Sequence, residues 1–329
     1  MFFAADDVGI LHYTNEKRYG TVDKSKKIVK LLELDDILVV REHVIESWKE
    51  GNCEKSCTLD HAIIDAYIYN NRIIVIQRKS IIIMNKTDLK IESTIDGDFD
   101  DYIQFDQGHI FLGGSGLKIL SLGEVENLEA ITTFSVPKPI FKSKQKKNAY
   151  NGVDELNYRC AFITSPTTFL ATSKYNIHFF DMMHGQRPVE IIPFGDSAFS
   201  QCVRVNDTEM LLSDVVGEVY LYDYVKKVQL RKYMDRESRS CATHFSISGD
   251  NLFIAYLDRH VRHFNINTRE LIGKVFLKNK LTCVLAEKVP EETDEDIWNE
   301  IPETVQKTKL SLPYEEDLEC PPLKKQKFE

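Results

Sequence analysis

The hydrophobic residues of this chain occur in short runs that are separated by turn residues. Residues 73–76 and 81–84 are two such runs, and the polar residues 77–80 lie between them. Short apolar runs bounded by turns are typical of β-strands, whereas an amphipathic helix would show a longer segment with a period of 3.6 residues. The pattern therefore predicts an all-β protein made of short antiparallel strands.

One unit of this pattern recurs with a fixed spacing. An apolar strand, a turn and a second strand end on an aromatic residue at Phe180, Tyr222 and Phe264, and these aromatic residues are 42 positions apart. A period of about 40 to 45 residues, built from strands and closed by an aromatic residue, is typical of a blade of a β-propeller. Such a fold favours an interaction platform over an enzyme.

Similar strand pairs extend back to the N-terminus and bring the total to seven, a common propeller size. The first pair has no strand before it, whereas two strand-like segments, 273–277 and 281–285, follow the seventh. We expect these C-terminal strands to complete the first blade, because ring closure removes exposed strand edges. The sequence thus predicts a seven-bladed WD-type β-propeller over residues 1–286. The predicted pairs are 2–5 with 9–13, 37–40 with 44–48, 73–76 with 80–84, 109–112 with 116–120, 168–172 with 176–181, 209–213 with 219–223, and 251–256 with 261–265.

A lysine-rich insertion interrupts the regular spacing between the fourth and fifth units. The second strands of these units end 60 residues apart, at Leu120 and Phe180, which predicts an insertion loop at about residues 135–158. Its lysines can contact phosphate groups or an acidic protein; the alternative is a loop that only faces solvent. The candidate residues are Lys138, Lys142, Lys144, Lys146 and Lys147.

The repeat ends near residue 286, and residues 287–329 are predicted to form a flexible acidic tail. The whole chain carries a net charge of −9, and residues 287–319 alone, with twelve acidic residues and three lysines, account for the same value. Trp298 lies in this acidic sequence and either contacts a partner or packs back on the propeller. Lys324, Lys325 and Lys327 follow two prolines and resemble a basic nuclear import signal.

No pattern for catalysis, a cofactor or a metal ion emerges from the sequence. Gly113–Gly116 lies between two strands and is predicted to be a hairpin turn rather than a phosphate loop. Cys53 and Cys57 have a weak zinc-like spacing without a second pair. Four further cysteines keep step with the blades, and we expect them to occupy one equivalent position on the inner strands, where a small side chain suits the crowded axis. They are Cys160, Cys202, Cys241 and Cys283.

The sequence also bears on the cellular compartment of the protein. The N-terminal residues lack the basic and apolar regions of a secretory signal, and no run approaches the length of a membrane span. We therefore expect an intracellular protein without a membrane partner.

The segment from Asp258 to Phe264 matches the turn and third strand of a WD-type blade. The carboxylate of Asp258 is expected to accept hydrogen bonds inside the turn and to fix its shape. Arg259 and Arg262 follow on the same segment and are candidates for contact with a partner.

Residues 257–264 and 271–285 resemble the seventh blade and closing strands of a nucleolar WD-repeat family that assists assembly of the large ribosomal subunit. The acidic stretch 293–298 and the basic residues 324–327 follow in the same order as in that family. Ahead of the fifth blade, Lys147, Asn148, Asp154, Leu156 and Arg159 occupy places comparable to a family motif. The resemblance covers the two ends of the chain and the insertion.

This resemblance implies a non-catalytic scaffold of the nucleus and nucleolus. It implies binding to ribosome assembly factors on pre-ribosomal particles, contact with the backbone of pre-rRNA, release by an AAA-type ATPase, and a monomer within a larger particle. The partner or RNA candidates that it adds are Asn148, Asp154 and Arg159.

Two other functions are less consistent with the sequence. A substrate-receptor propeller of a cullin-type ubiquitin ligase would show a Trp-Asp-x-Arg sequence after the second strand of a pair, but Trp48 is followed by Lys49 and Phe180 by Asp181-Met182. A propeller enzyme would need acidic residues that converge on the axis, and the sequence shows no such pattern.

Overall fold

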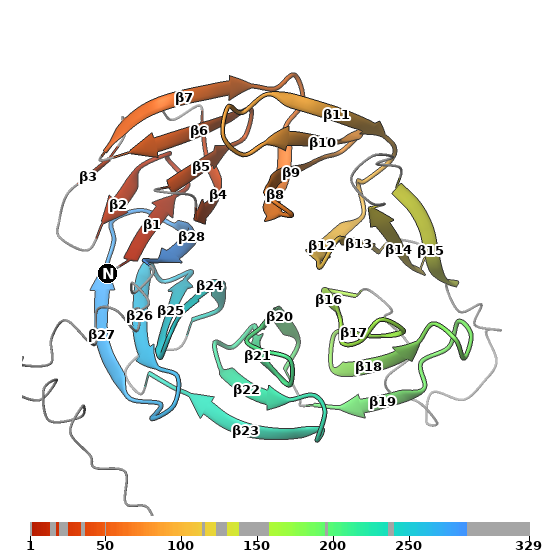
Figure 1. Cartoon of the computed structure of the whole chain (residues 1–329). Coiled ribbons are helices and arrows are strands. Elements are labelled where there is room, and N and C mark those ends of the chain that lie inside the picture. Colours follow the sequence, from red (N-terminus) through yellow and green to blue (C-terminus); the bar gives the residue numbers. More distant parts are fainter. Residues whose placement is uncertain are drawn as a thin grey trace, which may run out of the picture. The chain divides into compact units, whose positions relative to one another are not determined.

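The computed structural model describes residues 2–13, 18–19, 26–33, 37–49, 51–113, 116–122, 130–137, 158–194, 197–235 and 240–287. Every regular element within these ranges is a β-strand. The strands form seven four-stranded antiparallel sheets that are arranged as blades around one axis (Figure 1). The predicted seven-bladed propeller is therefore confirmed.

Each blade is a meander in which consecutive strands pair. Blade 1 contains β28 (Leu281–Ala286), β1 (Phe2–Asp6), β2 (Leu11–Tyr13) and β3 (Arg18–Tyr19). Blade 2 contains β4 (Ile28–Glu33), β5 (Ile37–Arg41), β6 (Val44–Lys49) and β7 (Asn52–Thr58), and blade 3 contains β8 (Ile63–Tyr69), β9 (Arg72–Gln77), β10 (Ser80–Asn85) and β11 (Ile91–Asp96). Blade 4 contains β12 (Tyr102–Asp106), β13 (His109–Leu112), β14 (Gly116–Leu122) and β15 (Ala130–Pro137).

The remaining three blades follow the same plan. Blade 5 contains β16 (Cys160–Ile163), β17 (Thr168–Thr172), β18 (Asn176–Asp181) and β19 (Glu190–Pro193). Blade 6 contains β20 (Phe199–Arg204), β21 (Glu209–Asp214), β22 (Val219–Asp223) and β23 (Val228–Tyr233), and blade 7 contains β24 (Ala242–Ser248), β25 (Asn251–Tyr256), β26 (His260–Asn265) and β27 (Leu271–Phe276).

The ring is closed by one strand from the C-terminal side. β28 pairs antiparallel with β1, with Phe3 opposite Leu285 and Ala4 opposite Val284. The prediction that two C-terminal strands complete the first blade is wrong for the segment 273–277, because β27 pairs with β26 as the outer strand of blade 7. A single strand therefore seals the ring.

The recurring aromatic residues lie in the cores between blades. Phe180, Tyr222 and Phe264 are each at most 2% exposed. The ring of Phe180 stacks on that of Phe169, with centroids 4.6 Å apart. Apolar residues of both neighbouring sheets surround these aromatic side chains, so that each pair of blades shares one cluster. The 42-residue period therefore records the repeated burial of one large side chain per blade junction.

Aspartates fix several of the turns between the second and third strands of a blade. Asp214 Oδ1 accepts hydrogen bonds from the backbone N–H groups of Val216, Gly217 and Glu218, at 3.0, 2.8 and 2.8 Å. Asp258 Oδ1 accepts one from His260 N at 3.2 Å, as expected from the sequence. These carboxylates accept hydrogen bonds from backbone N–H groups of the turns and so fix the shape of each turn.

Several predicted sites lie outside the described residues. The insertion was expected from about residue 135, but β15 extends to Pro137 and the next described residue is Tyr158. The candidates that fall outside the described ranges are Lys138, Lys142, Lys144, Lys146, Lys147, Asn148, Asp154, Trp298, Lys324, Lys325 and Lys327.

Candidate functional site

The innermost strands of the seven blades share one equivalent position next to the axis. At this position the innermost strand pairs with a residue of the second strand. In every blade the side chain of that second-strand residue points to the following blade. In six blades a register shift comes just before this position. The seven residues, which we call the axial ring, are Lys30, Asp65, Gln104, Cys160, Gln201, His244 and Cys283.

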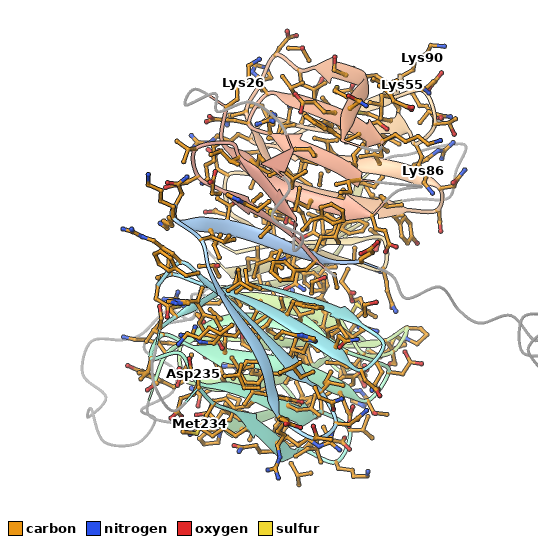
Figure 2. The ribbon with its side chains drawn as sticks, turned by 90° about the vertical axis from the view of Figure 1, so that its left-hand side faces the viewer. Lys26, Lys55, Lys86, Lys90, Met234 and Asp235 are labelled. Carbon is orange, nitrogen blue, oxygen red and sulfur yellow. The ribbon has the colours of Figure 1, made fainter. Side chains whose placement is uncertain are left out.

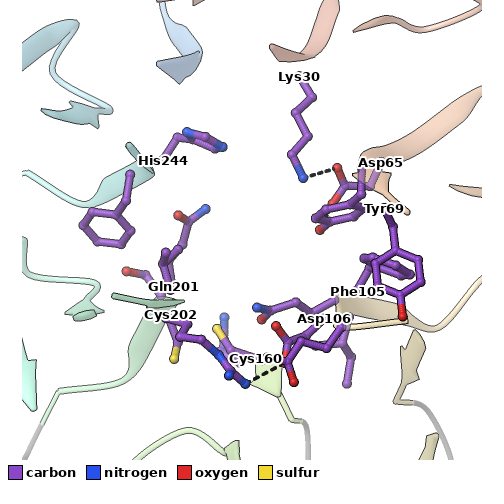
Figure 3. Close-up of a pocket in the computed structure, with 18 of the residues that line it drawn as sticks. Lys30, Asp65, Tyr69, Phe105, Asp106, Cys160, Gln201, Cys202 and His244 are labelled. Carbon is purple, nitrogen blue, oxygen red and sulfur yellow. Dashed lines mark hydrogen bonds and ion pairs between the residues drawn. The ribbon is translucent and has the colours of Figure 1, made fainter. Parts of the chain in front are cut away.

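Six members of the axial ring line a cavity of about 630 Å³. Figure 3 shows Lys30, Asp65, Cys160, Gln201 and His244 arranged around the open space. Every residue directly after an axial-ring member is buried in turn, because alternate residues of a strand point to opposite faces of its sheet. These buried neighbours are Leu31, Ala66, Phe105, Ala161, Cys202, Phe245 and Val284.

Side chains of the inner strands satisfy the backbone of the next blade. Gln104 Oε1 accepts from the N–H of Ala161 at 3.4 Å, and His244 Nδ1 accepts from that of Val284 at 3.4 Å. Gln201 Nε2 donates to the carbonyl of Thr243. An inner strand has a neighbour on one side only, so these polar side chains supply partners that a sheet would otherwise provide.

A partly buried ion pair occupies the wall between blades 2 and 3. Lys30 Nζ lies 2.8 Å from Asp65 Oδ1 and 3.3 Å from the centroid of the Tyr67 ring. The hydroxyl groups of Tyr67 and Tyr102 donate to Asp65 Oδ2 at 2.5 and 3.1 Å. Burial lowers the pKa of Lys30, and the carboxylate of Asp65 opposes that shift. Both charges are thus engaged within the wall.

A second ion pair joins blades 4 and 6 across blade 5. Arg204 Nη2 lies 2.8 Å from Asp106 Oδ2, and the same oxygen accepts from the N–H of Ile163 at 2.9 Å. The guanidinium carbon lies 5.0 Å from the centroid of the Phe162 ring. Across the cavity, burial, together with the positive charge of Lys30, lowers the pKa of His244 to about 4. The imidazole of His244 is therefore neutral near pH 7.

The axial ring was not found from the sequence, although a signal for it exists. Lys30 and Asp65 interrupt apolar inner strands, and a charged residue in such a strand needs a partner. The partner lies on another blade, and the register shift that aligns the two is not visible in the sequence.

The predicted equivalence of the four cysteines is only partly correct. Cys160 and Cys283 belong to the axial ring, but Cys202 lies one position further along its strand and points to the other face. Cys241 comes before the first residue of β24. The near-regular spacing of the four cysteines along the chain therefore does not place them at one position, because strand pairing puts Gln201 and His244 there in blades 6 and 7.

The three predicted arginines are found in different environments. Arg159 lines the axial cavity and is exposed. Arg259 is exposed at the turn between β25 and β26, where its φ is 68° and its Nη1 donates to the carbonyl of Lys278 at 3.3 Å. Both side chains are accessible to a partner within the described part of the chain.

Arg262 is not accessible, and its prediction as a partner contact is wrong. Its side chain is 0% exposed. Its Nε donates to Asp235 Oδ2 at 2.8 Å, its Nη2 to Asp258 Oδ2 at 2.5 Å, and its guanidinium lies 4.0 Å from the Tyr256 ring centroid. Asp235 also pairs with Lys274 at 2.8 Å. Arg262 therefore joins blade 6 to blade 7 from the inside.

Neither a metal centre nor a spanning helix is seen in the ranges given above. No group of three or more His, Cys, Asp or Glu residues there is placed to hold a metal ion. Cys53 and Cys57 both lie on β7, the outer strand of blade 2. None of the described residues belongs to a helix that is long and apolar enough to cross a membrane.

Comparison with known proteins gives one informative similarity. No protein-family model matches the chain. A WD repeat-containing protein of Dictyostelium discoideum is 26% identical over 132 residues, which is 38% of this chain. The matched part is 24% of that protein, so this chain spans about a quarter of its relative. The similarity agrees with the WD-type propeller seen in the structure.

Proposed function

We propose that this chain is a non-catalytic scaffold in nucleolar assembly of the large ribosomal subunit. In this role the propeller binds assembly factors on pre-ribosomal particles, its basic insertion contacts the backbone of pre-rRNA, and an AAA-type ATPase releases it. The observation that carries the proposal is a closed propeller whose last blade and closing strand, residues 257–285, are the segment that resembles the nucleolar family.

The geometry at the axis supports binding rather than chemistry. Four of the ionised groups that line the axial cavity are paired, as Lys30 with Asp65 and Arg204 with Asp106, and Arg159 is exposed at the same cavity. An acid or a base of an enzyme must instead be directed at a position that a substrate can occupy. A rigid ring with loops on both faces suits a protein that holds several partners at fixed positions.

Affinity purification of the tagged full chain tests this proposal. We expect large-subunit assembly factors and precursor rRNA to be recovered with the chain at moderate salt. An unrelated seven-bladed propeller with the same tag is the control. Recovery of cullin-ligase subunits without ribosomal precursors would replace the proposal with the substrate-receptor function.

A further inference from the structure

Five exposed apolar residues lie at one face of blades 6 and 7. Their side chains are between 42% and 60% exposed. They come from the turns between the second and third strands and from the ends of the fourth strands, and in an antiparallel meander these parts lie at the same face. Figure 2 shows the propeller edge-on, with Met234 toward this face and Lys86 and Lys90 toward the other. We call these residues the blade 6–7 patch; they are Val215, Val216, Met234, Leu257 and Phe276.

Backbone contacts join the turn of blade 6 and the segments of blade 7 that carry residues of the blade 6–7 patch. Gly217, with φ +100°, lies so close to Ser240 that a Cβ atom there would be 2.2 Å from the Ser240 carbonyl oxygen. The N–H of Leu257 donates to the carbonyl of Cys241 at 3.0 Å, and that of Leu277 to the carbonyl of Arg259 at 2.8 Å. These contacts join four segments, each to the next: the turn of blade 6, the start of blade 7, the turn of blade 7 and the end of β27.

The charges around this surface are predominantly positive. Asp235 and Asp258, next to Met234 and Leu257 in the chain, are engaged by the buried Arg262, and Glu218, in the turn of blade 6, pairs with Lys232. Arg259, Lys278 and Lys280 are exposed on the loops of blade 7. Asp7 is also exposed, and its N–H donates to the carbonyl of Lys280 at 2.9 Å. The described part of the surface therefore combines apolar side chains with three exposed cations and one exposed acid.

We propose that the blade 6–7 patch docks an acidic segment of a partner protein that carries aromatic or aliphatic anchor residues. The apolar side chains would bury the anchors, and Arg259, Lys278 and Lys280 would attract the acidic flanks. A nucleic acid fits less well, because only Phe276 among the five apolar residues could stack on a base. The inference does not depend on the pre-ribosomal role and applies to any partner of this chemistry.

Fluorescence anisotropy with the full chain and three labelled probes tests the inference. The probes are a synthetic peptide of Asp and Glu with one Trp and two Ile residues, the same peptide with Lys in place of the acids, and a single-stranded oligouridine of similar length. We expect the acidic peptide to bind most tightly. The double variant Leu257→Ser/Phe276→Ser should weaken its binding about tenfold, which is the range of interface anchors, and Lys278→Glu/Lys280→Glu should weaken it and reduce its salt dependence.

A matched control separates the patch from general surface hydrophobicity. Val228 and Leu230 are exposed to a similar degree on β23, outside the patch. Val228→Ser/Leu230→Ser should leave binding within about twofold, since exposed residues outside an interface contribute little. Equal losses in both double variants, with equal unfolding midpoints, would overturn the inference. So would preferred binding of the lysine peptide or of the oligouridine, or dimerisation of the chain that Leu257→Ser/Phe276→Ser abolishes in analytical ultracentrifugation.

Discussion

Single residues at blade junctions decide how well this ring holds together. Phe180 is buried between blades 4 and 5, in contact with the rings of Phe169 and Phe134. Arg262 holds two aspartates from different blades in a site without water access to its side chain. An apolar junction and an ionic junction thus perform the same structural task, and the loss of either one should destabilise the ring.

Phe180→Ala should lower the free energy of unfolding by about 3–5 kcal/mol, because a large aromatic side chain is removed from a packed core. Chemical denaturation monitored by circular dichroism measures the change. Met183→Ala, three residues further along the chain at a position that is 76% exposed, is the control and should change the free energy by less than about 0.5 kcal/mol. Equal effects of the two substitutions would contradict the burial of Phe180.

Arg262→Gln should destabilise the fold by about 3–5 kcal/mol, because Asp235 and Asp258 would lose their buried positive partner. Arg259→Gln, three residues away and exposed, is the matched control and should have little effect. Thermal unfolding of both variants measures the difference. A destabilisation by Arg259→Gln as large as that by Arg262→Gln would contradict the buried contacts of Arg262 with Asp235 and Asp258.

His178 should make stability depend on pH. Burial lowers its pKa to about 4, from an ordinary value of 6.5, so the folded state resists protonation while the unfolded state accepts a proton. The free energy of unfolding is therefore highest above pH 6.5, where His178 is neutral in both states, and it decreases as the pH falls toward 4, because the unfolded state then binds a proton at His178. Urea unfolding between pH 7 and pH 4 should therefore show a smaller loss of stability in His178→Gln than in the parent chain. His184→Gln, at an exposed position, should keep the parent slope.

At the scale of elements, the sequence predicted what depends on local pattern and missed what depends on register. The strand pairs were found because apolar runs and turn residues recur locally. The assignment of 273–277 to the first blade failed, since the choice between two neighbouring blades depends on pairing with β26. The axial ring and the Asp235–Arg262 contact join strands of different blades, and only the folded ring brings them together.

The basic insertion is also considered at the scale of elements, because its lysines would bind phosphate groups together. Replacement of Lys142, Lys144, Lys146 and Lys147 by Glu should reduce recovery of the chain with pre-ribosomal particles at fixed salt, as expected for lost phosphate contacts. Replacement of Lys26, Lys55, Lys86 and Lys90 by Glu changes the charge equally on blades 2 and 3 and is the control (Figure 2). Equal recovery of the insertion variant and the parent chain would leave the loop without a role in binding.

The basic end of the tail should direct the chain to the nucleus. Removal of residues 320–329 deletes Lys324, Lys325 and Lys327 and should shift a fluorescent fusion from the nucleus toward the cytoplasm. Replacement of the three lysines by arginine keeps the charge and should preserve nuclear import. An unchanged nuclear signal after the deletion would refute this function of the tail.

At the scale of the whole molecule, the seven blades stabilise one another in a ring that the pairing of β28 with β1 closes. Adjacent sheets are joined by apolar clusters all round the ring, and β28 links the last described residues to the first. In a closed ring every blade has a neighbouring blade on both sides, so the faces of the ring can bind partners without opening it. Both the proposed scaffold function and the proposed docking surface on blades 6 and 7 depend on that rigidity.

Native-state hydrogen exchange at β28 tests closure most directly. If the ring is sealed as described, the bonded amides of Leu281–Ala286 exchange as slowly as those of β21 and β25, because they open only when the propeller unfolds. Rapid exchange of β28 and β1 while the other blades stay protected would show an open ring and would contradict the account.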